Sequence, residues 1–171
     1  TYTWCNTDSA TNRGHQGTCG DGIDTLDFIA ALNSAGFGGF NDWRLPTNKE
    51  LASLADSVAS TGPVIDTSWF PLTVSSQYWS FDSWVNPNSS AWQVDFSNGE
   101  ISYGDKSAFY SVRAVRSGQS NSSTDRLIDN ADNTVTDTST GLMWRQNSDS
   151  TTRSWHDALA HSEGLVHAGY D

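Results

Sequence analysis

Few residues in this chain combine the types and spacing that catalysis needs. The four histidines (His15, His156, His161 and His167) share no metal-ligand spacing with a carboxylate, and His156 and His161 would point apart on a helix. The sequence contains no Gly-x-Ser-x-Gly elbow, no His-Glu-x-x-His pair and no phosphate-binding glycine loop. Pairs of acids suited to general acid–base work arise by chance in so aspartate-rich a chain. The sequence therefore predicts a protein that is not an enzyme.

One acidic run has a pattern that suits a hard cation. Asp129, Asn130, Asp132, Asn133 and Asp137 place short oxygen-bearing side chains close together, as calcium-binding loops do. The bidentate Glu and the tight Gly of an EF-hand are missing. Calcium held by Asp129, Asp132 and Asp137 is one interpretation, and an Asx-rich turn ahead of a strand is the alternative that we favour. No cofactor is required by either interpretation.

The only two cysteines, Cys5 and Cys19, enclose a loop rich in Gly, Asn, Thr and Asp. A loop of that composition gains order from a covalent link, which predicts a disulfide and an oxidising compartment. Two free thiols are the alternative. A zinc site is disfavoured because zinc requires four ligands and only His15 lies nearby.

Two aromatic segments, residues 81–88 and 103–110, carry the candidate ligand contacts. Tyr and Trp beside Asn, Asp and Ser suit stacking against sugars combined with hydrogen bonding, although the same mixture occurs in loops that seal a core. Both interpretations are open for Trp84 and Tyr103. The predicted ligand-binding residues are Trp84, Tyr103, Lys106, Phe109 and Tyr110.

Other aromatic and basic residues have a structural interpretation. Three tryptophans are predicted to lie in the core: Trp43, Trp79 and Trp92. Three arginines could contact an acidic glycan: Arg44, Arg113 and Arg116. In so acidic a chain, however, internal pairing with Asp66 or with neighbouring carboxylates is favoured for these arginines.

The elements that must position these residues begin with a helix start at Thr47. Pro46 excludes helical backbone at the residue before it, and Thr47 with Glu50 forms a capping box. Leu51, Leu54 and Val58 follow at helical spacing. The pattern predicts a helix over residues 47–58.

Further elements lie on both sides of that helix. Asp24 or Thr25 can cap a helix that ends at Gly36. Residues 77–80 indicate a strand, and the alternation over 92–96 followed by Asn98-Gly99 predicts a tight hairpin into 101–103. Residues 110–116 alternate again, which places Val112 and Ala114 on one face and Arg113 and Val115 on the other.

Composition excludes some partners. The chain has 171 residues and a net charge of −11, with 20 acids against nine Lys and Arg, so its surface repels nucleic acid and anionic lipid. No apolar run is long enough to span a bilayer. Since the chain begins at Thr1 without a signal peptide, we expect a processed end or a cut within a longer protein. Its length suits one good core.

A small-polar stretch, residues 119–123, is typical of a linker, and the sequence after it looks like a second beginning. Leu142-Met143-Trp144 is similar to Tyr2-Thr3-Trp4, and Trp155–Asp171 aligns without gaps with Thr25–Asn41. We therefore predict a module over 1–118 that lacks its first strand, and the N-terminal half of a second module over 124–171.

An ordered set of motifs supports a family resemblance. They are Asp42-Trp43-Arg44-Leu45-Pro46-Thr47, Ile65-Asp66-Thr67 before Phe70-Pro71, Tyr78-Trp79-Ser80, Ala91-Trp92-x-Val94-x-Phe96 and Val112-Arg113-Ala114-Val115-Arg116. In this order they resemble the Lcl C-terminal domain family of bacterial surface proteins, and residues 130–144 resemble the start of the same module.

The resemblance implies a C-type-lectin-like α+β fold, akin to the formylglycine-generating enzyme. Two short helices would flank a small twisted antiparallel sheet with long loops. It also implies a role in cell-surface adhesion or glycan binding. The related oxidase works through a pair of cysteines late in the domain, and no cysteine follows Cys19 here, so that activity is not expected.

Two functions follow as hypotheses for an extracellular or cell-surface protein. The first is a binding or adhesion module for glycan or protein ligands. The second is a subunit of a surface filament, assembled when one chain completes the half-module of another. The second hypothesis rests on an expected exposed apolar patch in residues 124–171. Its assembly residues would be Val135, Leu142, Trp144 and Trp155.

Overall fold

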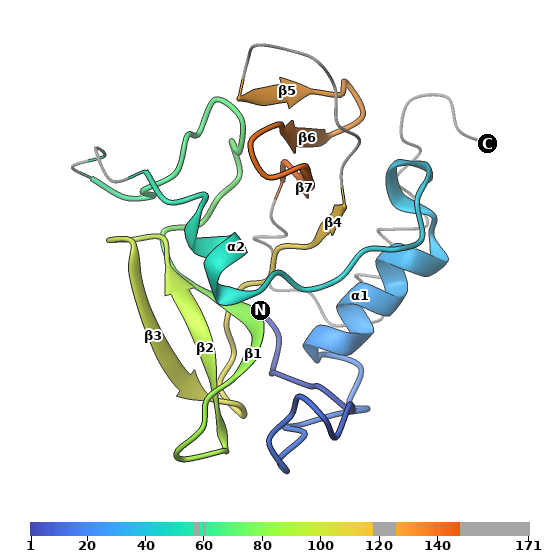
Figure 1. Cartoon of the computed structure of the whole chain (residues 1–171), viewed down its shortest axis with the longest axis vertical. Coiled ribbons are helices and arrows are strands. Elements are labelled where there is room, and N and C mark those ends of the chain that lie inside the picture. The colour runs from blue at the N-terminus through green and yellow to red at the C-terminus, as the bar shows by residue number, and fades with distance from the viewer. Residues whose placement is uncertain (57–58, 60, 118–125, 148–171) are drawn as a thin grey trace.

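The computed structural model describes residues 1–56, 59, 61–117 and 126–147, and within them the fold is α+β (Figure 1). Its helices are α1 (Thr25–Ser34), the short 3-10 helix η1 (Phe37–Gly39) and α2 (Asn48–Ala52). Its strands are β1 (Gln77–Ser83), β2 (Ser90–Asp95), β3 (Glu100–Asp105), β4 (Val115–Ser117), β5 (Leu127–Asp129), β6 (Thr134–Asp137) and β7 (Leu142–Arg145). These strands form two antiparallel sheets, one more than expected.

Helix α2 confirms the predicted capping box but is shorter than predicted. The Thr47 side chain accepts a hydrogen bond from the Glu50 amide, and the Glu50 carboxylate accepts one from the Thr47 amide. The helix ends at Ala52 because the chain turns there to hydrogen-bond with the segment before β1, the Asp56 amide donating to the Val64 carbonyl at 2.8 Å. This single turn of helix still buries Leu51 completely.

Helix α1 confirms the predicted start and stop. Its N-cap is Asp24, whose carboxylate accepts hydrogen bonds from the amides of Leu26 and Asp27. Ala35 closes the other end, and Gly36 follows with a φ of +60°, a left-handed conformation that glycine adopts without strain.

The first sheet has the order β1-β2-β3, and its β2–β3 hairpin confirms the Asn-Gly prediction. Asp95 pairs with Glu100 across the turn, and Gly99 in that turn has a φ of +80°. Strand β1 is longer than expected, and its pairing with β2 shifts register between Trp79 and Ser83. That irregularity leads the chain out of the sheet toward Trp84.

The second sheet has the order β4-β7-β6-β5, and it joins residues 1–117, through β4, to residues 126–147. Strand β4, the last of residues 1–117, pairs with β7 through Val115 opposite Trp144 and Arg116 opposite Met143. Residues 126–147 thus share a sheet with residues 1–117, while most of the remaining residues of the predicted second module, 148–171, lie outside the described part of the chain. The predicted linker 119–123 lies outside the described residues.

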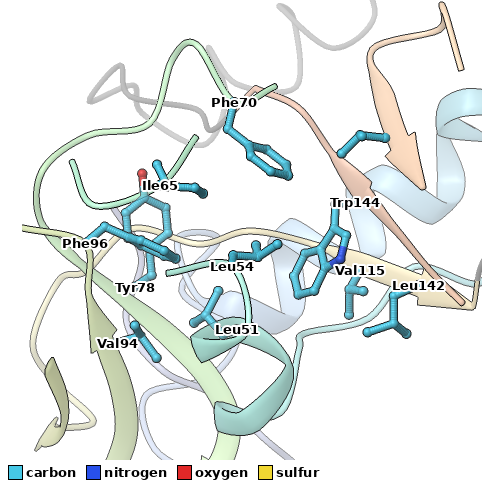
Figure 2. Packing of buried hydrophobic residues seen from close by; sticks show 11 residues of the cluster. Leu51, Leu54, Ile65, Phe70, Tyr78, Val94, Phe96, Val115, Leu142 and Trp144 are labelled. Carbon is cyan, nitrogen blue, oxygen red and sulfur yellow. The ribbon is translucent and has the colours of Figure 1, made fainter. Parts of the chain in front are cut away.

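Two hydrophobic clusters fill the interior, and β7 contributes to both. Trp144 and Leu142 belong to a first cluster with Leu51, Tyr78 and Val115, and Figure 2 shows them pointing into this shared interior. Met143, which alternates with them along β7, belongs to a second cluster around Trp4, Trp43 and Trp79. Strand β7 therefore lies at the junction of the two cores.

The assembly surface predicted in this region is not exposed. Val135 and Trp144 are 0 % exposed and Leu142 is 8 % exposed, because the chain's own β4 and α2 regions cover them. The prediction that these three form an exposed patch is wrong. Trp155 lies outside the described residues. Assembly into a filament stays a prediction, but the expected exposure of Val135, Leu142 and Trp144 no longer supports it.

The segment that ends in β4 has the predicted facing, although its regular strand covers only Val115–Ser117. Val112 and Ala114 enter the second cluster, whereas Val115 enters the first and Arg113 lies over the ring of Phe70 in that cluster. The earlier residues are held by isolated bridges instead, such as Tyr2 with Tyr110.

The two segments that the predicted repeat aligns, which end at Trp4 and Trp144, lie in different surroundings. Trp4 is buried in the second cluster, and its indole Nε1 donates to the Ser80 carbonyl at 2.9 Å. Trp144 is buried in the first cluster within a central strand. The residues that align with Thr25–Asn41 lie outside the described part of the chain.

The predicted disulfide between Cys5 and Cys19 is confirmed. It closes a loop that turns sharply at Gly17, where the φ is +83° and an added Cβ would lie 2.1 Å from the Trp4 carbonyl oxygen. Only glycine fits at that position. The covalent link thus fixes a loop whose backbone packs directly against a core tryptophan.

Candidate binding surface

Three aromatic rings gather beside the β2–β3 hairpin, and we call Trp84, Trp92 and Tyr103 the aromatic platform. The rings of Trp84 and Tyr103 stack with centroids 4.6 Å apart and planes 6° from parallel. Trp92 meets Trp84 edge to face at 4.5 Å. Such geometries are favourable arrangements for aromatic pairs.

Backbone hydrogen bonds hold the platform in place. Trp92 and Tyr103 are directly opposite each other on β2 and β3, so they extend from the same face of the hairpin. Trp84 follows β1, and its amide donates to the Ser90 carbonyl at 2.9 Å while its indole Nε1 donates to the Asn86 carbonyl at 2.6 Å. The short loop 84–90 therefore folds the Trp84 ring back over the hairpin.

The platform is partly open to solvent. Tyr103 is 50 % exposed, and Ile101, two residues earlier on the same face of β3, is 45 % exposed. Trp84 and Trp92 are half-buried. Trp43 and Trp79 lie in the core as predicted, but the prediction for Trp92 is wrong, because it lies in the platform and in neither core cluster.

The other predicted ligand contacts do not join this platform. The Tyr110 ring lies against the backbone of Gly104, where an added Cβ would be 2.6 Å from a ring carbon, and it packs on Trp79 at 4.4 Å. Since neighbouring strand residues face opposite sides, Tyr110 lies on the face of β3 opposite to Tyr103. Phe109 is 52 % exposed. The predicted set is therefore not one surface.

Lys106 is also misplaced by the prediction, because it is a core residue. It is 1 % exposed, and its ammonium lies 4.2 Å from the centroid of a Trp4 ring. The Nζ atom donates to the carbonyls of His15 at 2.6 Å and Asn12 at 3.3 Å. Lys106 thus ties the disulfide loop to the end of β3 and is unavailable to a ligand.

Burial lowers the pKa of Lys106 from 10.5 to about 8. Between those values the unfolded chain binds more protons than the folded one, so folding stability rises with pH across that window. We expect the free energy of unfolding of the wild type, relative to Lys106→Met, to rise between pH 8 and pH 10. Urea titrations at fixed ionic strength would measure it. Lys49→Met removes an exposed lysine and is the control; a pH-independent difference between wild type and Lys106→Met would contradict the expectation.

The three arginines considered for an acidic glycan are all engaged internally. Arg44 forms a bidentate pair with Glu50, with both hydrogen bonds at 2.8 Å. Arg116 binds Asp42 at 2.6 and 3.2 Å. The favoured internal interpretation holds for both, with carboxylates other than Asp66.

Arg113 is internal as well, and the partners seen among the described residues are neutral groups. It is 1 % exposed and donates to the carbonyls of Arg145 at 2.7 Å and Gln146 at 3.0 Å, and to the Thr73 hydroxyl at 2.7 Å. Burial lowers the pKa of Arg113 from 12.5 to about 10. Arg113 therefore binds the end of β7 and the residue that follows it.

The carboxylates considered for calcium do not gather. Asp129, Asp132 and Asp137 accept hydrogen bonds from the amides two residues later, at 2.7, 3.0 and 2.9 Å, as in Asx turns. In the described part of the chain, the carboxylates that do gather are those of Asp21, Asp24 and Asp27. The Asp24 carboxylate there is already occupied by the amides that it caps.

Sequence reasoning missed Trp92 as a surface residue, although a signal was available. The Asn-Gly turn fixes the register of the hairpin, with Asp95 opposite Glu100. Counting residue pairs away from the turn, from Asp95–Glu100, places Trp92 opposite Tyr103, which is one of the predicted ligand contacts. The register could therefore have added Trp92 to the site.

These features define a small disulfide-bonded α+β module with an aromatic surface beside its hairpin. A family model described as the Lcl C-terminal domain matches residues 2–116, and the chain belongs to that family. No curated protein and no solved structure matches the chain significantly. The structure adds residues 126–147, beyond this match, to the same sheet and core. Within the described residues, none of the helices has the length and apolarity needed to traverse a bilayer.

Proposed function

We propose that the protein is a non-enzymatic extracellular binding or adhesion module that recognises glycan or protein ligands through the aromatic platform. The observation that carries the proposal is the stacked Trp84–Tyr103 pair, held rigidly beside Trp92 yet half open to solvent. Rigid aromatic rings offer a large contact area at little cost in conformational entropy. The C-type-lectin-like architecture expected from the family resemblance agrees with such a role.

Two further features support an extracellular binding role. The Cys5–Cys19 disulfide fits an oxidising compartment, as found outside the cell. The loop that carries Trp84 also presents the exposed Asn86 and Asn88 amides, which suit hydrogen bonding to hydroxyl groups. Aromatic stacking combined with a few neutral polar groups is the common composition of a small ligand site.

A glycan array and a panel of extracellular matrix proteins would test the proposal. We expect the wild type to bind at least one member, and Tyr103→Ala to weaken that binding at least about tenfold, which corresponds to roughly 1.4 kcal/mol. Trp84→Ala should have a similar effect, because Trp84 stacks on Tyr103.

Leu72→Ala is a matched control, because Leu72 is an apolar residue that is 53 % exposed and lies outside the platform. Its binding should equal that of the wild type. Thermal unfolding of each variant would show that the fold is retained. Binding that survives both platform substitutions, or no binding to any ligand on the array and panel, would overturn the proposal.

A further inference from the structure

We propose, resting on the proposed function, that the aromatic platform selects uncharged glycans and discriminates against sulfated or carboxylated ones. Recognition of acidic sugars requires arginine or lysine groups that can approach the anion, often in bidentate geometry. In the part of the chain that the structure describes, most cations are paired with acids or buried, and the exposed Lys49 and Arg13 lie apart in the sequence.

Most of the basic residues that the structure describes have partners within the fold. Carboxylates bind Arg44, Arg116 and Arg126, the last through Asp137 at 3.5 Å. Lys106 and Arg113 are each 1 % exposed. The Arg145 guanidinium lies 5.3 Å from the centroid of the Phe37 ring. Each of these six cations is therefore paired with an acid, buried, or in contact with an aromatic ring.

The charge next to the platform is negative instead. Asp105 lies two residues after Tyr103 on the same face of β3, opposite Ser90. Hydrogen bonds from Ser107 lower the pKa of Asp105, so this carboxylate stays ionised at neutral pH. Glu100 and Asp95 are paired at the turn end of the hairpin, but strand alternation places them on the face opposite Tyr103. An anionic sugar approaching the platform would meet the carboxylate of Asp105 and a chain of net charge −11.

Among the described residues, Arg13 lies near the platform loop. The Arg13 carbonyl accepts a hydrogen bond from the Asn88 side-chain amide at 3.2 Å, which places the exposed Arg13 beside the end of loop 84–90. A single arginine adjoining an acidic surface does not make the cluster that a sulfate or carboxylate ligand needs. The groups nearest the rings are amides and the Tyr103 hydroxyl, which bind neutral hydroxyl groups.

A glycan array printed with matched pairs would test this selectivity, each neutral glycan standing beside its sulfated or sialylated counterpart. We expect binding to neutral members only, with at least tenfold weaker signals for the acidic counterparts at 50 mM salt. Raising the salt to 500 mM should leave neutral binding nearly unchanged, because stacking and neutral hydrogen bonds are not screened. Tyr103→Ala should abolish the neutral signals.

The outcomes separate the two proposals. Equal or stronger binding to the acidic counterparts, weakened by salt and by Arg13→Ala, would overturn the selectivity while leaving the binding function intact. Neutral binding that persists in Tyr103→Ala would overturn the use of the platform and the selectivity with it. An absence of glycan binding, with a matrix protein still bound, would overturn the selectivity alone. Arg13→Ala is expected to change neutral binding by less than about twofold, as for other exposed surface charges.

Discussion

Trp144→Ala is expected to lower the free energy of unfolding by about 4 kcal/mol, as for other large-to-small substitutions in cores. Trp144 is 0 % exposed and packs in the first cluster with Leu51, Leu54, Phe70 and Val115. Truncation would leave a large cavity at the junction between β7 and residues 1–117. A single cooperative urea transition with a lower midpoint would confirm that both parts unfold together.

Trp84→Ala provides the matched control, since it removes another tryptophan that is only half-buried. It should cost clearly less stability than Trp144→Ala. Two results would contradict a shared core. One is an unchanged midpoint in Trp144→Ala, and the other is loss of structure confined to residues 126–147, seen by hydrogen exchange while the amides of β1 and β2 stay protected.

Arg113→Ala is expected to destabilise the fold by a similar amount, about 4 kcal/mol, through a different mechanism. The substitution removes three charge-assisted hydrogen bonds and leaves the carbonyls of Arg145 and Gln146 and the Thr73 hydroxyl without this donor. It also removes the contact with the Phe70 ring at 4.7 Å. Guanidinium titrations of the purified variant would measure the change.

Arg44→Ala is the control for removing an arginine. Arg44 pairs with Glu50 at the surface, where its side chain is 44 % exposed, and such pairs contribute about 0 to 1 kcal/mol. Arg113→Lys should recover only part of the loss, because an ammonium cannot reproduce the planar fork that reaches both sides of the site. Equal effects of Arg113→Ala and Arg44→Ala would refute the assigned role of Arg113.

The local elements of this fold could be predicted because their signals lie within a few residues of each other. The capping box at Thr47, the cap at Asp24 and the Asn-Gly turn at Gly99 each specify a conformation through neighbouring groups. The end of α2 could not be read in this way. It depends on a hydrogen bond to Val64, which the sequence places in a separate segment.

Long-range placement was harder to predict. Nothing in the pattern of residues 142–145 indicates that β7 pairs with β4, and a resemblance to the start of the chain favoured a separate module instead. The predicted set of ligand-binding residues was partly wrong for a similar reason. Lys106 and Tyr110 look like loop residues in sequence, but both follow the end of β3 and pack inward. Lys106 is buried against Trp4, and the Tyr110 ring packs on Trp79 on the side of Gly104 away from Tyr103.

The position of β7 at the junction of the two clusters has a consequence for biosynthesis. While only residues 1–117 have left the ribosome or an export channel, β4 has no partner on the side where β7 lies, and the first cluster lacks Trp144 and Val135. Cooperative folding of the first cluster therefore requires about 30 more residues to emerge. Contacts between residues so far apart in the sequence form slowly. We therefore expect residues 1–117 to remain incompletely folded until strands β5, β6 and β7 have emerged.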